Sequence, residues 1–381
     1  MKTGDLKIAL VCPYDFACPG GVASHVIGLD KQLTQMGHRV KILAPISEAS
    51  RNPGNRFIAI GKPYAIPVSG SIARITISIK LATRIKAVLE RERFDIVHLH
   101  EPFMPMLCSA VLRFSTSVNI GTFHATEGKP GYNFCWPISR IWLKKRARKL
   151  NGMIACCNEA LNYVMKFLPG EYELIPDGID LDHFSTGVDP IEEFTDGKLN
   201  ILFVGRFERR KGLIYLINAY QRVKEKCPET RLIIVGSGNT TRNRYKTYVR
   251  EKGLKDVVFT GRVSYDNLPR YYKTADIFCS PAIAHESFGI VLLEAMALSK
   301  PVIATRIPGH ASWITSGGEG LLVKPGDVDE LGKALLLLLT DESLRENMGD
   351  RALRTAKRYD MQNVAGQIAA YYRKAYEKMR S

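Results

Sequence analysis

Residues 281–297 read PAIAHESFGIVLLEAMA, and the second half of the chain is best interpreted outward from them. The apolar run Ile290–Leu293 follows a short polar segment that ends in Gly289, so we expect a loop that turns directly into a buried helix. A helix start offers unpaired backbone N–H groups and the positive end of the helix dipole, which suits a phosphate. Gly289 removes a side chain where such a ligand must come close.

Two glutamates, Glu286 and Glu294, flank this loop and helix start. Glu294 is expected roughly 7–8 Å along the helix axis, at 1.5 Å per residue. That distance matches the reach from a phosphate to the ribose of one nucleotide, and a carboxylate there can accept two hydrogen bonds from a ribose diol. Glu286 at the loop tip can do the same for a sugar. The alternative for Glu294 is a solvent-exposed helix residue, which its apolar neighbours disfavour.

A basic segment, FVGRFERRKG, occupies residues 203–212 upstream. It follows the strand-like run 199–204, so Arg206 and Lys211 are expected at the carboxyl end of a strand, where open α/β sheets bind ligands. Arginine as a planar fork and lysine as a point charge can together neutralise a diphosphate. The alternative is a solvated basic loop.

Near the start of the chain, a predicted strand at 7–12 leads to Gly20-Gly21 and a helix from Val22. The glycine pair allows backbone amides to contact an anion.

In this order, these elements resemble the retaining glycosyltransferases of family 4, which have the GT-B fold. The resemblance covers essentially the whole chain and is strongest with bacterial phosphatidylinositol mannosyltransferases. The segments that carry it are VCPYDFACPGGVASHV (11–26), HLHEP (98–102), GTFHAT (121–126), IPDGID (175–180), FVGRFERRKG (203–212) and HESFGIVLLEAMA (285–297).

The resemblance implies an α/β chain with GT-B architecture, two Rossmann-like doubly wound domains that face each other across a cleft. The expected parts are an N-terminal acceptor-side domain (1–176), a linker (177–197), a nucleotide-sugar-binding domain (198–360) and a C-terminal helix that crosses back to the first domain (361–381).

The pattern of the chain agrees with this, because strand and helix patterns alternate throughout, which favours parallel sheets covered on both faces. In the first half, strands are predicted at 7–12, 39–44, 96–100, 119–123 and 153–155, with a helix at 22–36. In the second half, strands are predicted at 199–204, 231–235, 257–259, 277–279 and 302–304, with helices at 328–339 and 364–379.

The expected reaction is transfer of a hexose from a nucleoside-diphosphate sugar, GDP- or UDP-linked, to a lipid or lipid-linked acceptor. The residues expected to bind the donor are Gly20, Gly21, Arg206, Lys211, Val263, Glu286, Ser287, Phe288, Gly289, Ile290 and Glu294. The residues expected on the acceptor side are Tyr14, His25, His124 and Thr126. The catalytic residues are expected to be His124, Arg206, Lys211 and Glu286.

No cofactor is expected, since Arg206, Lys211, the helix start and the Gly20-Gly21 amides supply the positive charge that a departing diphosphate needs. The sequence Asp180-Leu181-Asp182 has the D-x-D form of a manganese site, but it falls in the predicted linker, so we expect no metal there.

The chain departs from the mannosyltransferases at two places. Ala23 stands where they carry a glutamine that contacts inositol, and residues 261–265, GRVSY, lack the lysine that they use near guanine. The sugar, the nucleotide base and the acceptor are therefore left open. A soluble acceptor such as an inositol phosphate or a polysaccharide is the alternative, and a sugar-nucleotide epimerase shares the fold.

Composition limits the setting in which this chemistry occurs. The chain has 381 residues, 45% hydrophobic and 24% charged, as in soluble globular proteins, and it lacks an apolar run long enough to span a membrane. Residues 1–16 read as a first strand and not as a signal peptide, so we expect a cytoplasmic protein. The eight cysteines include no C-x-x-C pair, which favours free thiols over disulfides or a zinc site.

The net charge of +16 implies anionic partners. In residues 72–93, isoleucines and other apolar residues recur at helical spacing, and cations that include Lys80 and Arg84 recur on another face. Residues 140–149 are denser in cations, including Lys144 and Lys145, and both segments are predicted as helices that bind the inner face of the cytoplasmic membrane. The alternative is a solvated face of ordinary core-packing helices. Nucleic acid is not expected as a partner, because the basic residues are not interleaved with aromatic platforms.

Overall fold

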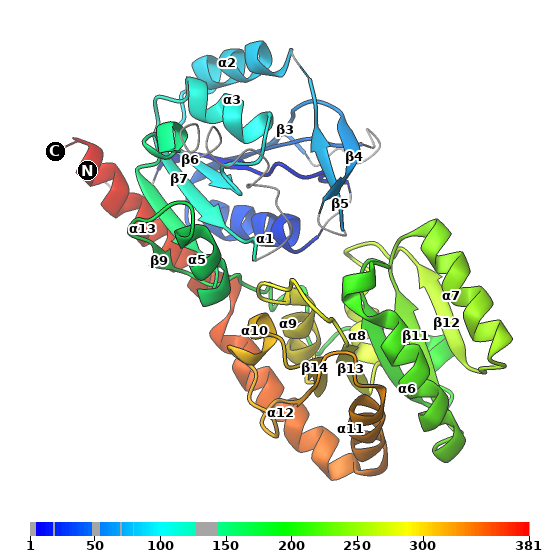
Figure 1. Ribbon diagram of the computed structural model, residues 1–381. Helices are drawn as coiled ribbons and strands as arrows, with labels where there is room; N and C mark the ends of the chain where they lie inside the picture. Colours follow the sequence, from blue (N-terminus) through cyan, green and yellow to red (C-terminus); the bar gives the residue numbers. More distant parts are fainter. Residues whose placement is uncertain are drawn as a thin grey trace. The chain divides into compact units, whose positions relative to one another are not determined.

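The computed structural model describes residues 5–17, 20–47, 54–68, 71–78, 80–126 and 144–380. The chain divides into two compact units, of which the first combines Met1–Gly178 with Met361–Ser381 and the second is Ile179–Asp360. Each unit holds a parallel sheet with helices packed on it (Figure 1), which confirms the expected pair of α/β domains. Residues 179–197, which make up most of the expected linker (177–197), belong to the second unit.

The first unit is built on a parallel sheet with the strand order β3-β2-β1-β6-β7-β8-β9. The strands are β1 (Lys7–Val11), β2 (Arg39–Ala44), β3 (Phe57–Ala59), β6 (Ile96–His100), β7 (Val118–Phe123), β8 (Gly152–Ala155) and β9 (Glu173–Leu174). Its helices are α1 (Gly21–Gln35), α2 (Leu81–Glu92), α3 (Leu107–Phe114), α5 (Asn158–Met165) and α13 (Met361–Arg380). The strands expected here are present, each within one residue of its predicted ends.

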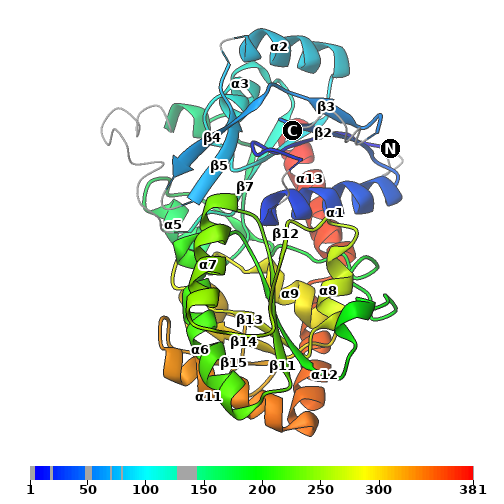
Figure 2. The same cartoon turned by 90° about the vertical axis from the view of Figure 1, so that its right-hand side faces the viewer.

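Alternate residues of β1 point to opposite faces of this sheet. Ile8 and Leu10 join a core with α1 and α13, whereas Ala9 and Val11 join a second core with α2 and α3. Figures 1 and 2 show these two helix layers on either side of the strands. Both faces are buried, as a parallel sheet requires.

The C-terminal helix α13 packs beside α1 in the first unit (Figure 2). Tyr372 is fully buried, and its hydroxyl lies 2.6 Å from Nδ1 of His98 in β6. Met361 fills the space that a side chain would need at two glycines, since a Cβ on Gly28 or Gly178 would lie 2.9 Å from its atoms. The helix is thereby fixed to the sheet by both packing and a buried hydrogen bond.

The prediction of one helix over residues 72–93 is wrong. The segment begins as strand β5 (Ser71–Thr76), which pairs antiparallel with β4 (Pro63–Val68), and the helix α2 begins only at Leu81. Isoleucines at helical spacing misled the prediction, because a short apolar run fits either period and strand pairing settles it. The apolar face of α2 is buried, with Ile85 fully buried, so only its charged face reaches solvent.

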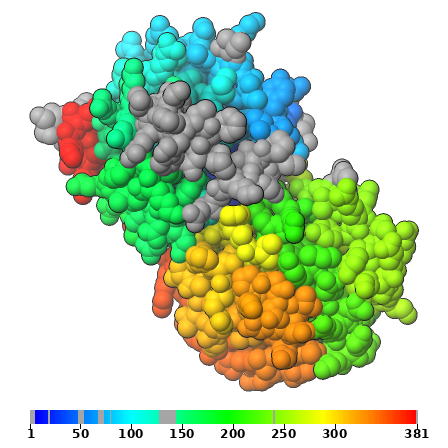
Figure 3. Space-filling model, viewed as in Figure 1, coloured from blue at the N-terminus to red at the C-terminus, as the bar shows by residue number. Residues whose placement is uncertain are grey.

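The second unit is built on a parallel sheet with the order β12-β11-β10-β13-β14-β15. The strands are β10 (Leu199–Val204), β11 (Thr230–Val235), β12 (Val257–Gly261), β13 (Ile277–Ser280), β14 (Val302–Thr305) and β15 (Gly320–Val323). The helices are α6 (Leu213–Lys226), α7 (Asn239–Glu251), α8 (Leu268–Thr274), α9 (Ile290–Ala297), α10 (Pro308–Ala311), α11 (Val328–Thr340) and α12 (Glu342–Arg358). Helices α6 and α11 pack together, and the green and orange parts of this unit adjoin on the face shown in Figure 3.

Strand order identifies where each sheet can bind a ligand. In the second unit β10 lies between β11 and β13, and in the first unit β1 lies between β2 and β6. After β10 and β13 the chain therefore continues toward opposite edges of the second sheet, and after β1 and β6 toward opposite edges of the first sheet. The crevice between two such strands, where the strand order reverses, is the usual ligand site of an open α/β sheet.

Two expectations about the whole chain can be compared with the described residues. Among them no helix is both long and apolar enough to cross a membrane. The cysteines that the structure describes are all free, and they are Cys12, Cys108, Cys156, Cys157, Cys227 and Cys279.

The loops after β10 and β13 touch backbone to backbone at Gly212. This residue precedes α6 with φ +70°, and a Cβ built on it would lie 1.9 Å from the carbonyl oxygen of Pro281. Only glycine tolerates both the left-handed backbone and this approach.

We predict that Gly212→Ala lowers the free energy of unfolding of the second unit by about 3 kcal/mol, because strain and a backbone clash add. Gly253→Ala is the matched control. Gly253 has φ +62°, and no atom of the described residues lies within 4 Å of its Cβ position, so we expect the free energy of unfolding to fall by only about 1 kcal/mol. Urea unfolding followed by circular dichroism measures both. Equal losses in the two variants would show that the contact with Pro281 carries no constraint.

Candidate active site

The loop after β10 and the loop after β13 form one structure at the switch point of the second unit. The backbone N–H of Ile283 donates to the carbonyl of Arg210 at 2.8 Å, and Arg210 Nη1 donates to the carbonyl of His285 at 3.0 Å. Together with the approach at Gly212, these bonds bring the basic segment and the glutamate segment of the sequence together.

Alternating charges connect the two loops. Lys211 Nζ lies 2.8 Å and Arg210 Nη1 2.5 Å from Oε1 of Glu286. Glu208 in turn lies 2.9 Å from both Arg210 Nε and Arg206 Nη1. Three cations thus face two carboxylates, which leaves the cluster net positive and suited to a diphosphate.

Burial differs along this cluster. The Glu286 side chain is only 10% exposed and that of Arg206 is 47% exposed. Burial alone would raise the pKa of Glu286, but Lys211 and Arg210 outweigh it and lower that pKa to about 2. Glu286 is therefore a carboxylate at any physiological pH and can only accept hydrogen bonds.

Helix α9 begins directly after this cluster. Gly289 precedes it with φ +77° and ψ +55°, and no side chain caps the helix. Leu292 N–H donates to the carbonyl of Gly289 at 2.8 Å, so an anion at this helix start would meet the N–H groups that precede it. Ser287 and Ile290 are half-buried beside Gly289, but Phe288 is buried, and its ring stacks on Trp313 at 5.2 Å. Of these residues, which were predicted to bind the donor sugar nucleotide, Phe288 therefore packs its side chain into the core.

Glu294 lies on α9 and is 4% exposed, which excludes the solvent-exposed alternative. The Tyr272 hydroxyl donates to its Oε2 at 2.6 Å. Burial raises the pKa of Glu294 to about 7, against smaller opposing effects of Tyr272 and Lys211. A carboxyl group held near its pKa can bind a ribose diol in either protonation state.

His310, which the sequence analysis did not select, lies beside the start of α9. It is fully buried, its Nδ1 lies 3.2 Å from the carbonyl of Thr305, and its Nε2 has no partner. A Cβ on Gly289 would be 3.2 Å from that nitrogen. Burial lowers the pKa of His310 to about 4, so the ring is neutral. The available signal was a histidine in the short segment IPGH that follows the predicted strand 302–304.

Val263 is half-buried and follows β12, which is separated from β10 by β11. The structure therefore places it apart from the charged cluster, along the same carboxyl edge of the sheet.

In the first unit, Gly20 is extended (φ −129°, ψ −178°) and Gly21 begins α1, which has no side-chain cap. In the part of the chain that the structure describes, no atom lies within 4 Å of a Cβ built on Gly20. Packing in this unit does not demand glycine at that position, so open space at a bare helix start is left for a ligand.

Four histidines of the first unit gather where β1, β6 and β7 end. His124 Nδ1 lies 3.1 Å from Asp177 Oδ1, and its Nε2 lies 3.0 Å from Nδ1 of His100. His25 Nδ1 lies 3.4 Å from the same oxygen of Asp177. His98 and His100 share one strand face, as alternation predicts, with ring centroids 4.3 Å apart.

The charge in this histidine cluster rests on one ring. Burial alone would lower the pKa of His124, but Asp177 outweighs it and raises that pKa. Burial lowers the pKa of His25 to about 4 and holds those of His98 and His100 well below the ordinary value. His124 is thus the ring of this cluster whose pKa is raised, through its close contact with Asp177, while burial lowers the pKa of the other three.

His124 is held by a carboxylate that the sequence analysis did not select. Oε1 of Glu101 accepts the backbone N–H groups of both His124 and Ala125 at 2.6 Å. Glu101 is 1% exposed and has φ +55°, and its place in HLHEP after a strand was the available signal.

Of the other predicted acceptor-side residues, His25 belongs to this cluster, whereas Tyr14 and Thr126 are not among its contacts within the described residues. His25 is 2% exposed, whereas Tyr14 and Thr126 are half-buried. Tyr14 forms a bridge with Ile75 of β5.

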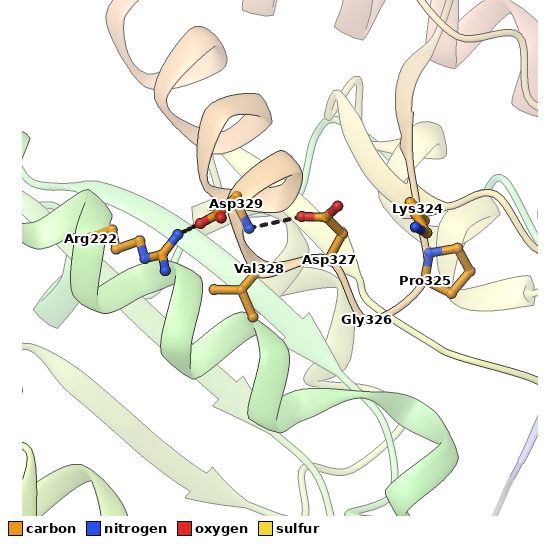
Figure 4. Close-up of a pocket in the computed structure, with 7 residues that line it drawn as sticks. All are labelled: Arg222, Lys324, Pro325, Gly326, Asp327, Val328 and Asp329. Atoms are coloured by element: carbon orange, nitrogen blue, oxygen red, sulfur yellow. Dashed lines mark hydrogen bonds and ion pairs between the residues drawn. The ribbon is translucent and has the colours of Figure 1, made fainter.

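A surface hollow at the start of α11 (Figure 4) is a second place where a ligand could be considered. Arg222 pairs with Asp329, and Asp327 accepts the N–H groups of Asp329 and Glu330 at 3.1 and 2.9 Å. The helix start is already occupied by Asp327, so this hollow does not suit a phosphate.

Comparison with known proteins identifies the family. Residues 19–183 match the model described as Glycosyltransferase Family 4, and residues 188–355 match Glycosyl transferases group 1. A phosphatidyl-myo-inositol mannosyltransferase of Mycobacterium leprae is 34% identical over 369 residues, which cover 96% of this chain and 96% of that protein. The chain belongs to glycosyltransferase family 4.

This family 4 glycosyltransferase has other relatives. A D-inositol 3-phosphate glycosyltransferase of Kribbella flavida is 32% identical over 391 residues, covering 94% of this chain and 92% of that protein. Among solved structures, sucrose-phosphate synthase from Thermosynechococcus elongatus superposes with a TM-score of 0.79 at 22% identity, covering 98% of this chain and 100% of that chain. The GT-B fold and a transferase activity are thus established.

The opposite pKa shifts of the two glutamates predict opposite effects of neutralising them. Glu294→Gln should stabilise the enzyme at pH 8 by about 2 kcal/mol, since it removes a buried charge that the folded state disfavours. Glu286→Gln should destabilise it by a similar amount, because Lys211 and Arg210 lose their partner.

The pH dependence of stability tests whether ionisation of Glu294 destabilises the folded state. Its pKa is raised to about 7 in the folded state, so the wild type loses stability as pH rises from about 4.5 to 7. The advantage of Glu294→Gln should therefore grow between pH 5 and pH 8 in urea unfolding. A constant difference across that range would contradict the buried, protonated Glu294.

Proposed function

We propose that this glycosyltransferase moves a hexose from a nucleoside-diphosphate sugar to a lipid or lipid-linked acceptor at the inner face of the cytoplasmic membrane, with retention of anomeric configuration and without a divalent metal. The observation that supports it most is the charged cluster of the second unit, where Lys211, Arg210 and Arg206 adjoin the open start of α9.

The donor diphosphate is assigned to this cluster. When the sugar–phosphate bond breaks, the leaving diphosphate gains negative charge, and fixed cations and helix N–H groups stabilise it most at that moment. Arg206 is the exposed cation of the cluster and Lys211 the buried one, so Arg206 meets the outer part of the diphosphate and Lys211 the reacting end. Glu294, eight positions beyond Glu286, is assigned to the ribose.

Glu286 is assigned to the transferred sugar. Lys211 and Arg210 both contact its Oε1, so we assign Oε2 to a sugar hydroxyl. The low pKa of Glu286 keeps it an acceptor throughout the reaction. We propose a front-face route, in which the acceptor hydroxyl enters on the side that the phosphate leaves and passes its proton to that phosphate.

His124 is assigned to the reacting sugar because it ends β7 at the carboxyl edge of the first sheet. Both of its ring nitrogens have partners in the first unit, so a bond from Nε2 to a sugar hydroxyl requires that Nε2 leave His100. Gly20 and Gly21 supply backbone amides at the same edge.

The lipid acceptor is supported by relatives and by charge. The mycobacterial relative is named for phosphatidyl-myo-inositol, and Lys80, Arg84, Lys144 and Lys145 are exposed on the first unit. Since the apolar face of α2 is buried, these cations would hold the membrane by electrostatic attraction and not by insertion. The Kribbella relative supports the alternative, a soluble inositol phosphate acceptor.

We predict that one nucleoside diphosphate from a panel of GDP, UDP and ADP raises the melting temperature in the presence of EDTA, as metal-independent binding requires. Arg206→Ala should weaken that nucleotide at least tenfold by calorimetry, through loss of a phosphate contact. Stabilisation by none of the three, or only with added Mg²⁺ or Mn²⁺, would refute the metal-free donor site.

Glu286→Ala should reduce transfer from the matching sugar nucleotide by a factor of at least about 100 while the affinity for the nucleoside diphosphate changes less than about threefold. Glu330→Ala, a change of a partly buried glutamate on α11, is the control and should transfer normally. Partition of the labelled product between water and organic solvent distinguishes a lipid acceptor from an inositol phosphate.

Replacing Lys80, Arg84, Lys144 and Lys145 by Ser should weaken binding to vesicles of anionic lipid by about tenfold or more at low salt, since each cation near such a surface contributes about 1 kcal/mol. The control replaces four exposed cations of the second unit, Lys246, Lys252, Arg262 and Arg270, and should bind as the wild type does. Equal sedimentation of both variants with the vesicles would remove the proposed membrane role.

A further inference from the structure

A second cluster of chemical interest lies wholly inside the first unit and shares only His124 with the proposed transfer reaction. His124, Cys156 and Asp177 each offer a ligand atom, and these atoms all lie within 4.8 Å of one another. The three residues follow β7, β8 and β9, which are adjacent in the sheet, so their strands deliver them to one carboxyl edge. We propose that they bind a zinc ion.

The donor set selects the class of metal. An imidazole nitrogen, a thiolate sulfur and a carboxylate oxygen suit Zn²⁺ and Co²⁺, whereas Mg²⁺ and Mn²⁺ prefer oxygen alone. Ligands of one tetrahedral zinc lie about 3.3–3.8 Å from one another, so a small inward movement of the side chains completes the site. His124 Nδ1 and Asp177 Oδ1, at 3.1 Å, are already at such a separation.

The surroundings of the cluster match those of a zinc site. A ligating histidine usually donates its other ring N–H to a neighbour, and His124 Nε2 lies 3.0 Å from His100 Nδ1. A ligating carboxylate is usually held as well, and His25 Nδ1 lies 3.4 Å from Asp177 Oδ1. These contacts fix the orientation of two ligands before the metal arrives.

One oxygen of Asp177 lacks a directed hydrogen bond, which indicates that a ligand of this carboxylate is missing. Its Oδ1 is buried and has no well-directed hydrogen bond, although two histidine nitrogens lie nearby. A buried carboxylate oxygen without a directed partner is costly, and a metal ion would satisfy it.

Charge balances when the ion binds. The Cys156 thiol releases one proton to solvent, His124 binds through a neutral imidazole, and the thiolate and the Asp177 carboxylate then neutralise Zn²⁺. Cys157 is half-buried, with its Sγ 3.8 Å from that of Cys156. The fourth position is left for water.

Zinc at this site would hold His124 by Nδ1 and fix the strand end that carries it. Transfer should therefore be inhibited by Zn²⁺ and restored by a chelator. This consequence, unlike the site itself, rests on the proposed function.

The test is titration of the full-length, reduced, tag-free protein with Co²⁺, followed by displacement with Zn²⁺. The wild type should show the near-ultraviolet charge-transfer band of a cobalt thiolate with one equivalent bound, and Cys156→Ala should lose that band. Cys279→Ala removes an equally buried cysteine of the second unit and should keep it. Asp177→Asn should bind Zn²⁺ at least tenfold more weakly in competition with a chromophoric chelator.

A wild type without the thiolate band, a Cys156→Ala variant that retains it, or an Asp177→Asn variant with unchanged zinc affinity would overturn the site. Circular dichroism shows whether each variant is folded, and the isosteric Asp177→Asn keeps the proposal testable if Cys156→Ala does not fold. Failure to find transferase activity leaves this spectroscopic result intact, so the two proposals stand or fall separately.

Discussion

The ion pairs of Glu286 with Lys211 and Arg210 are the contacts on which the second unit's site depends. A carboxylate that is only 10% exposed is costly unless cations surround it, and those cations come from the loop after another strand. The pairing therefore fixes two loops at once and leaves excess positive charge beside the open start of α9. In the first unit a buried glutamate is likewise held by groups from another strand, but these donors are uncharged. Glu101 accepts two backbone N–H groups at the end of β7 and fixes the position of His124.

Much of the framework was predictable because it follows from local pattern. Buried parallel strands appear as short apolar runs, so Leu199–Val204 and Ile96–His100 were predicted to the residue. The loops that carry the candidate site were predictable as well, since charged residues and glycines directly after such runs must lie at the carboxyl edge. Strand β5 was not predictable, because its isoleucines fit a helical period and only pairing with β4 decides between the two.

The partners within the site were not predictable, because they are set by side chains distant in sequence. Glu286 was expected to face a sugar, and nothing local shows that Arg210, 76 positions earlier, contacts it. The cluster of His124, Cys156 and Asp177 was missed for a related reason. The cysteine spacing gave no zinc pattern, since each of these residues follows a different strand. The environment of His310 likewise depends on a glycine 21 positions before it in the sequence.

The return of α13 to the first unit has a consequence for modularity. The second unit leaves the first after Gly178 and rejoins it at Met361, and Ile179 N–H donates to the carbonyl of Tyr359 at 2.8 Å where its own two ends meet. A segment whose ends adjoin can be exchanged as a cassette with only two junctions, both at one point of the fold. Recombination between genes of this architecture can thus replace the second unit of an enzyme while the strands and the closing helix of the first unit remain those of a single ancestor.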